Sequence, residues 1–361
     1  MLTLTHLKEG LRIYLTSLKT KRKGFRQYQG SAEEICKQII HNCWNGRFFQ
    51  ASTTNFAQFW TRDFNWCCKS LIQLGHQEKV KQTLDYALNI FQKHNQITTT
   101  ITPSGTPYNV YHYAVDSLPS IINALKTLND QEFINKYKPF LEKEITKFFN
   151  LVIEKETGLV KRKNFSSMKD YSKRKSSCYD NCMVAFLANN LKKLNLLNPF
   201  EKYNYPQLIK QQLWNGQYFY DDLNKQNYVA GDANIFPFVL GIFNDPEMIK
   251  SCLNHIQQTK LDQPFPLKYT NHRPEHFIWL EFIVRGYEKD TLWQHMAPLY
   301  LKLTQITDQE KFNQYYQQMT QLIEKHKNYL EVFYPNGQPF KTSLYCCDQG
   351  MLWAANYLTL K

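Results

Sequence analysis

Apolar residues recur along the chain at intervals of three and four positions, the spacing that places side chains on one face of an α-helix. The segment from 78 to 94 shows it clearly, with Val80, Leu84, Ala87, Leu88 and Phe91 on one face. The pattern predicts helices at about 3–19, 31–40, 63–74, 78–94, 117–128, 130–154, 179–194, 206–214, 233–243, 245–258, 275–286, 291–305, 308–328 and 347–358. Strand patterns are scarce, so we expect an all-α protein.

Capping residues and loops suggest how these helices are organised. Ser31 and Glu34 have the spacing of a capping box, and Gly75 follows the helix predicted to end at Leu74. Loops rich in Gly, Pro, Asn, Tyr and Trp follow helix pairs rather than every helix. Six hairpins of roughly 60 residues would use almost the whole chain, which favours a closed double ring of helices. No flexible linker interrupts it, so we expect one domain over 1–361, with 1–30 as an N-terminal helix and basic lead-in.

Composition supports a folded protein without a membrane span. Of the 361 residues, 43% are hydrophobic and 21% charged, enough to bury a real core. The longest apolar run, Ile235 to Phe243, falls far short of the ~20 residues that cross a bilayer. Glu9 interrupts the N-terminus before an apolar signal segment develops. The nine cysteines lack disulfide spacing. We therefore expect a cytoplasmic protein with no membrane partner, whose cysteines serve as small core residues.

The net charge of +13 makes nucleic acid a partner to consider. Basic runs occur at 19–23, 161–163 and 173–175, but none lies in a recognised nucleic-acid-binding motif. We interpret them as solvated loop charge and expect no nucleic-acid partner. The cysteines and histidines show no zinc spacing, and phosphate-binding glycine loops are absent from the sequence. The sequence therefore predicts neither a metal nor a cofactor.

Several polar residues stand in aromatic surroundings near predicted helix ends. Arg62 and Asp63 begin a helix beside Trp60, where they could bind vicinal hydroxyls next to a stacking ring. Asp63 could equally be a simple helix-start charge. Asp170 and Glu331 lie in loops between helices. Acids on such loops of one ring would converge on a funnel, and hydrolysis of a glycosidic bond needs two carboxyls.

Together these segments resemble the six-hairpin (α/α)6-barrel glycosidase superfamily. That superfamily includes glucoamylase-like enzymes, trehalases, neutral invertases, mannosylglycerate hydrolases and the amylo-1,6-glucosidase module of debranching enzymes. The resemblance covers roughly residues 45–360. It implies an all-α (α/α)6 toroid that binds a small carbohydrate substrate.

The motifs also carry expected catalytic roles. The segment from Met168 to Asp170, before an apolar helix, is similar to the superfamily segment that carries the general acid, which implies Asp170. Relatives with a G-x-D-N motif here would move that role to Asp180. The segment from 329 to 337 resembles the one near the catalytic base, which implies Glu331, with Asp348 as the alternative.

Further motifs imply residues that shape the sugar site. Trp60-Thr-Arg62-Asp63 is similar to the W-x-R-D segment of the −1 subsite, and 350–355 resembles the closing helix. The expected substrate-binding residues are Trp60, Arg62, Asp63, Tyr111, Asp180, Asn181, Trp214, Asp232, Asn234, Trp293 and His295.

The expected activity is inverting hydrolysis of a short α-linked glucoside. In that case the carboxyls of Asp170 and Glu331 lie ~6.5–9.5 Å apart, and the acid has a raised pKa. The flanking cations Lys169, Lys173, Arg174 and Lys175 would lower that pKa, so the assignment requires them to point into solvent. Alternatives are an invertase-like sucrose hydrolase, a glycoside phosphorylase, and a catalytically inactive barrel that binds sugar or polyanions. The sequence leaves the oligomeric state open.

Overall fold

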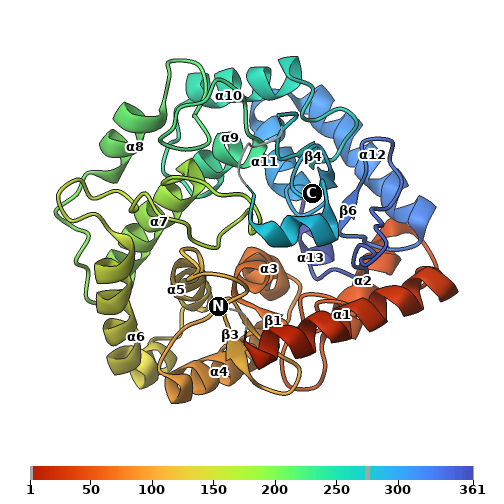
Figure 1. The fold of residues 1–361 in the computed structure, drawn as a ribbon, viewed down its shortest axis with the longest axis horizontal. Helices are drawn as coiled ribbons and strands as arrows, with labels where there is room; N and C mark the ends of the chain where they lie inside the picture. The colour runs from red at the N-terminus through yellow and green to blue at the C-terminus, as the bar shows by residue number, and fades with distance from the viewer. Residues whose placement is uncertain (1–2, 273–276, 361) are drawn as a thin grey trace.

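The helices after the first alternate between an inner and an outer ring in the computed structural model, which describes residues 3–272 and 277–360 (Figure 1). The inner ring contains α3 (Thr61–Gln73), α5 (Ser117–Leu128), α7 (Cys178–Leu194), α9 (Gly231–Val239), α11 (Ala297–Thr307) and α13 (Ala354–Leu358). The outer ring contains α2 (Ala32–Cys43), α4 (Gln77–His94), α6 (Gln131–Val152), α8 (Tyr205–Leu213), α10 (Pro246–Gln258) and α12 (Gln309–His326). Each outer helix thus alternates with an inner one along the chain.

Burial of apolar side chains explains why the two rings form. The outer helix α4 buries Val80, Leu84, Ala87, Leu88 and Phe91, the face that its sequence predicted. The inner helix α5 is buried on nearly every side. A helix with one apolar stripe belongs at a surface, whereas one that is apolar all round belongs inside.

Contacts between helices close the structure into a ring. Successive inner helices pack together from α3 through α5, α7 and α9 to α11, and each outer helix packs on an inner neighbour. The last helix, α13, packs against both α2 and α3, so the end of the chain meets its beginning. The prediction of an all-α (α/α)6 toroid is confirmed.

The first helix, α1 (Leu4–Lys23), lies outside the two rings and crosses the lower right of the view in Figure 1. Its buried Glu9 accepts hydrogen bonds from Arg12 and from Gln58 of the ring. Arg12 also donates to the backbone carbonyl of Asn55, 2.8 Å away. These polar contacts hold α1 against the ring, because the two charges satisfy each other where water is partly excluded.

Three predicted helices near the C-terminus are wrong in extent. In 291–305, residues Leu292–Trp293 form a strand and the helix begins only at Ala297, with Pro298 in its first turn. In 347–358 only Ala354–Leu358 is helical, since Gly350 adopts a left-handed conformation with φ of 63°. In 275–286 a 3-10 helix spans Trp279–Val284, while residues 275 and 276 lie outside the described residues.

Two small antiparallel sheets join the loops between helices. One has the order β1 (Phe59–Trp60), β2 (Thr100–Ile101), β3 (Pro107–Tyr108), and the other β4 (Leu267–Lys268), β5 (Leu292–Trp293), β6 (Val332–Phe333). In the second sheet, Trp293 pairs with Leu267 on one side and Val332 on the other. These pairings bring together loops that are far apart in the chain.

The nine cysteines are free and buried, which confirms the prediction that they serve as core residues. None of the helices in the described part of the chain is long and apolar enough to span a bilayer.

Candidate active site

The candidate site lies where the inner helices begin. Because neighbouring helices along the chain run in opposite directions, all inner helices start on the same face of the ring. Asp63, Asp180 and Asp232 lie in the first turns of α3, α7 and α9, and Asp116 directly precedes α5. The positive end of a helix dipole stabilises negative charge at such positions. This face therefore collects carboxylates.

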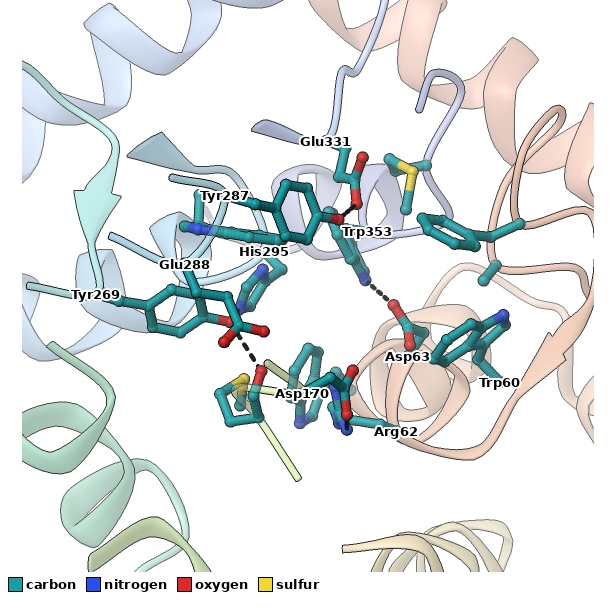
Figure 2. Close-up of a pocket in the computed structure, with 16 residues that line it drawn as sticks. Trp60, Arg62, Asp63, Asp170, Tyr269, Tyr287, Glu288, His295, Glu331 and Trp353 are labelled. Atoms are coloured by element: carbon teal, nitrogen blue, oxygen red, sulfur yellow. Dashed lines mark hydrogen bonds and ion pairs between the residues drawn. The ribbon is translucent and has the colours of Figure 1, made fainter. Parts of the chain in front are cut away.

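A cavity opens at the centre of this face, and we call it the inner cavity (Figure 2). It encloses about 510 Å³ of empty space, including its opening. Its lining residues are Ala51, Phe56, Trp60, Arg62, Asp63, Trp66, Met168, Asp170, Tyr269, Tyr287, Glu288, Trp293, His295, Glu331, Met351 and Trp353. Seven residues that the sequence indicated meet there, namely Trp60, Arg62, Asp63, Asp170, Trp293, His295 and Glu331.

Glu331 is buried on one side of the inner cavity, just before strand β6. Its carboxylate accepts hydrogen bonds from the hydroxyls of Tyr287 and Tyr345, the latter at 2.6 Å, and from the backbone N–H of Asp348 at 2.8 Å. Burial and the nearby charge of Asp348 raise its pKa to about 7, while these hydrogen bonds oppose the rise. Glu331 is thus held in one orientation and titrates close to neutral pH.

Asp170 approaches from the opposite side of the cavity (Figure 2). Its side chain is 16% exposed, and its Oδ1 atom has no hydrogen-bond partner among the described residues. Burial raises the pKa of Asp170 to about 6; Arg62 lowers it and Asp116 raises it. The carboxyl group therefore keeps its proton at a higher pH than an ordinary aspartate does, and the exposed part of its side chain lines the cavity.

Arg62 is buried below Asp170 and is held by several groups. Its Nε donates to Asp116 at 2.6 Å, a second nitrogen donates to the carbonyl of Ser167, and the guanidinium lies 3.6 Å from Asp170. The sequence placed Arg62 and Asp63 together as a pair for sugar hydroxyls. In the structure the partner of Arg62 is Asp116 rather than Asp63. Because the same guanidinium also lies near Asp170, Arg62 helps to position that carboxyl group.

Asp63 faces the cavity from the first turn of α3. Its Oδ1 accepts a hydrogen bond from the indole N–H of Trp353 at 2.9 Å, which ties α3 to the closing helix α13 (Figure 2). Burial raises the pKa of Asp63 to about 6 against the opposing charge of Arg62. Asp63 and Trp60 thus place a carboxyl group and an aromatic ring side by side in the cavity lining.

The cations that flank Asp170 do not all point into solvent, which corrects the sequence-based requirement. Lys173 is exposed, but Lys169 and Arg174 are buried. Both contact the same two acids: Lys169 lies 3.2 Å from Asp221 and from Asp232, and Arg174 lies 3.1 Å and 2.7 Å from them. Two buried acids therefore neutralise two buried cations. The interpretation of the run 173–175 as solvated loop charge is likewise wrong for Arg174.

Glu288 was not singled out by the sequence, yet it is buried and lines the inner cavity. Its carboxylate accepts hydrogen bonds from the backbone N–H groups of Tyr171 and Ser172 at 3.0 Å, and from the Ser172 hydroxyl at 3.1 Å. Burial and repulsion from Asp170 raise its pKa to about 7. Glu288 thus fixes the backbone that carries Asp170. Glu288 lies in a loop between two predicted helices, as Glu331 does. That position could have indicated Glu288 as a candidate site residue in the sequence.

Aromatic rings form the remaining walls of the inner cavity. The His295 ring stacks on Trp66 at 5.1 Å, and Trp293 lies edge-on to His295 at the same distance. Burial, together with Arg62, holds the pKa of His295 well below its usual range, so the imidazole is neutral. Flat apolar rings beside carboxylates suit a sugar, whose C–H face is apolar and whose rim carries hydroxyls.

The other predicted site residues lie outside the lining of the inner cavity. Tyr111 lines a neighbouring cavity, and its hydroxyl donates to that of Tyr171 at 3.0 Å. The remaining ones, buried or partly buried, are Asp180, Asn181, Trp214, Asp232 and Asn234. Asn181 and Asn234 bind backbone groups, and Asp232 binds Arg174.

Asp348, the alternative base, also lies outside this lining. Its side chain accepts hydrogen bonds from the backbone N–H groups of Asn55, Phe56 and Gln349 at 2.8–2.9 Å. Asp348 therefore organises the loop beside Glu331. No group of three or more histidine, cysteine or acidic side chains able to hold a metal ion occurs among residues 3–272 and 277–360.

The fold can be compared with known proteins, although no family model and no curated protein matches the sequence. A rhamnosidase from Klebsiella oxytoca with rhamnose bound matches with a TM-score of 0.65 and 10% identity over 91% of this chain and 62% of its own. A bacterial glucoamylase complexed with acarbose matches with a TM-score of 0.62 and 15% identity, over 91% and 54%. A GH63 mannosylglycerate hydrolase from Thermus thermophilus matches with a TM-score of 0.62 and 10% identity, over 91% and 99%.

The chain therefore shares the fold of these three solved structures. The resemblance that the sequence motifs indicated is therefore confirmed, at the level of the fold. The chain spans about half to two thirds of the rhamnosidase and the glucoamylase but nearly all of the mannosylglycerate hydrolase.

Proposed function

We propose that this protein is an inverting glycoside hydrolase that acts on an α-linked glucoside. The observation that carries the proposal is the meeting of Asp170 and Glu331 on opposite sides of one aromatic-walled cavity. The similar solved structures carry the names of glycoside hydrolases, and the glucoamylase among them is complexed with acarbose. Two opposed carboxyls are what glycoside hydrolysis requires.

In the proposed mechanism Asp170 is the general acid. Its proton passes to the oxygen of the leaving group as the bond from that oxygen to the anomeric carbon breaks. Glu331 is the general base and removes a proton from a water molecule, whose oxygen bonds to the opposite face of the same carbon. The products are the free sugar with inverted configuration and the protonated leaving group.

The surroundings of the two carboxyls support these roles. A general acid must reach the leaving oxygen, and the side chain of Asp170 lines the inner cavity and is 16% exposed. A general base must be oriented toward water, and Glu331 is oriented by two tyrosines and one backbone N–H. The raised pKa of Asp170 keeps part of its population protonated at neutral pH.

Hydrolysis is favoured over phosphorolysis by the pairing of the nearby cations. A phosphorylase needs free positive charge to hold phosphate in place of the base. Lys169 and Arg174 are both paired with Asp221 and Asp232, outside the inner cavity lining. A barrel that binds polyanions would also need unpaired positive charge. The pairing of Lys169 and Arg174 therefore argues against that alternative as well.

Paired substitutions and two substrates test the roles. We expect Asp170→Asn to lower kcat/KM for maltose by about 100- to 10,000-fold, but to affect α-glucosyl fluoride much less, because fluoride leaves without a proton. Glu331→Gln should impair both substrates. NMR of the first product should show the β-anomer.

The matched control for these variants is Asp180→Asn, which removes a buried carboxylate outside the inner cavity and should retain most activity. Circular dichroism would establish that each variant is folded. Wild-type rates for both Asp170→Asn and Glu331→Gln would overturn the proposal. Loss of activity in Asp180→Asn alone would move the acid to that residue.

A further inference from the structure

A second cavity adjoins the inner one, and we call it the outer cavity. Together with its opening to solvent it measures about 1290 Å³, against about 510 Å³ for the inner cavity measured in the same way. The two share Phe56, Trp60, Asp170 and Tyr287 in their linings. A molecule that reaches the catalytic carboxyls can therefore extend from one cavity into the other.

The two cavities differ in their chemistry. Five charged side chains line the inner cavity, whereas Asp170 is the one charged side chain among the described residues that line the outer cavity. Aliphatic and aromatic side chains form almost all of the rest, including Leu11 of α1, Val110, Ile283 and Leu344. The outer cavity thus offers a large apolar surface.

Five of its six tyrosines add little polarity, because their hydroxyls already take part in hydrogen bonds. Tyr111 donates to Tyr171, and the Tyr287 and Tyr345 hydroxyls donate to Glu331. The Tyr108 hydroxyl accepts a hydrogen bond from a neighbouring side-chain amide. A saccharide in this cavity would leave hydroxyls unsatisfied, at a cost in binding free energy. An apolar group would meet no such cost.

The position of the general acid shows which part of the substrate enters the outer cavity. Asp170 lines both cavities, whereas Glu331 lines only the inner one. The acid gives its proton to the leaving oxygen and therefore lies on the side of the leaving group. The sugar that is cleaved then occupies the inner cavity, and the leaving group occupies the outer one.

We propose that the outer cavity binds an apolar aglycone, so that the substrate is a glycoside of a long-chain alkyl or an aryl alcohol. This inference rests on the proposed function, since it uses the general acid to orient the substrate. The reaction needs water alone: the glycosidic C–O bond breaks, Asp170 protonates the departing alkoxide oxygen, and water supplies the new hydroxyl of the sugar.

A chain-length series tests the proposal. We expect kcat/KM, measured as released glucose, to rise from methyl to butyl to octyl α-glucoside, by at least about tenfold between butyl and octyl, since each fully buried methylene can contribute about fourfold. Octyl α-glucoside should also exceed maltose. Equal values along the series, or a preference for maltose, would overturn the inference and leave the hydrolase assignment standing.

Leu11 and Leu344 are 58% and 40% exposed, so their substitution should leave the fold intact. The double variant Leu11→Ser/Leu344→Ser should lose most of the preference for octyl over methyl α-glucoside. Leu7→Ser is the matched control, because Leu7 lies on the same helix, is 63% exposed and does not line the outer cavity. An unchanged preference in the double variant would overturn the inference.

A binding measurement separates failure of this inference from failure of the proposed function. Octyl 1-thio-α-glucoside, in which sulfur replaces the leaving oxygen, should quench tryptophan fluorescence with a Kd at least about tenfold below that of the methyl analogue. The Leu11→Ser/Leu344→Ser variant should remove this difference. If no glycoside is hydrolysed and the difference persists, the hydrolase assignment fails while the apolar site stands. Equal Kd values would overturn the apolar site itself.

Discussion

The environments of Asp170 and Glu331 differ at the scale of single residues. Asp170 lines the cavity with a side chain that is 16% exposed, and its buried Oδ1 atom lies 3.6 Å from the guanidinium of Arg62. Glu331 receives three hydrogen bonds and lies near another acid. A carboxyl that must hand over a proton needs access to the substrate, whereas one that must accept a proton needs a fixed direction. These environments are the reason for the roles that we propose.

The pH dependence of kcat/KM should reveal these two groups. The pKa of Asp170 is about 6 and that of Glu331 about 7. Activity needs Asp170 protonated and Glu331 ionised. Because the acid has the lower of the two pKa values, only a small share of the molecules holds both states at once, and kcat/KM falls below about pH 6 and above about pH 7. We therefore expect a narrow bell with its maximum midway, at about pH 6.5.

Initial rates at low substrate concentration between pH 4 and 9 would give this profile. Glu331→Gln should remove the acidic limb and Asp170→Asn the alkaline limb from whatever activity is left. A flat profile in the wild type from pH 5 to 8 would contradict both assignments.

At the scale of elements, the site depends on close contacts between the first residues of inner helices and the short strands. Gly231 begins α9, and its backbone N–H donates to the carbonyl of Tyr269 at 2.7 Å. A Cβ atom on Gly231 would lie 2.4 Å from the backbone oxygen of Lys268 in strand β4. Only a glycine permits this approach, which places Tyr269 in the wall of the inner cavity.

Gly231→Ala should lower the free energy of unfolding by about 1–3 kcal/mol, because the backbone of β4 must move away. It should also reduce activity, since Tyr269 moves with that strand. Gly10→Ala is the matched control: it lies inside α1, its Cβ would meet nothing within 4 Å, and alanine should stabilise the helix by about 0.5–1 kcal/mol. Urea unfolding of both variants measures the difference; equal stabilities would contradict the close approach at Gly231.

At the scale of the whole molecule, the ring concentrates buried acids in a protein of net charge +13. The pKa values of Asp63, Asp170 and Asp180 are raised to about 6, and those of Glu288 and Glu331 to about 7, with burial as the largest cause in each. Burial of this kind costs stability once the groups ionise.

The protein should therefore become less stable as the pH rises from about 4 to about 7. In that window the unfolded chain releases its carboxyl protons first, so the folded state binds more protons and the free energy of unfolding falls with pH. One buried aspartate whose pKa is raised from 3.8 to about 6 contributes on the order of 3 kcal/mol to this fall in the free energy of unfolding. The lowered pKa values of four histidines, His76, His112, His295 and His326, act in the opposite direction, while the raised pKa values of Asp222 and Asp348 add to the effect of the five acids.

Thermal unfolding at pH 5 and pH 7.5 in buffers of equal ionic strength would test this expectation. The wild-type Tm should be lower at pH 7.5 by several degrees. Glu288→Gln keeps the side-chain shape but cannot ionise, so its Tm should fall less over the same interval. A wild-type Tm that rises between the two values would contradict the burial of these carboxyls.

The sequence alone determined most of the helices, their alternation and the closed ring, because these follow from local periodicity, caps and the number of hairpins that the chain can form; it misplaced the extents of three helices near the C-terminus. It also located Trp60, Asp63, Asp170, Trp293 and Glu331, which the structure brings to one cavity. The predictions succeeded where a residue's surroundings are set by its neighbours in the chain.

The tertiary structure decided which charges face the cavity and which neutralise each other. The pairing of Lys169 and Arg174 with Asp221 and Asp232 depends on a loop and a helix start that are separated in sequence. The hydrogen bonds of Glu288 to the backbone next to Asp170 likewise join segments that are far apart in sequence. Electrostatic energy depends on distance in space and on exclusion of water, and neither is written in local sequence, so these features required the folded ring.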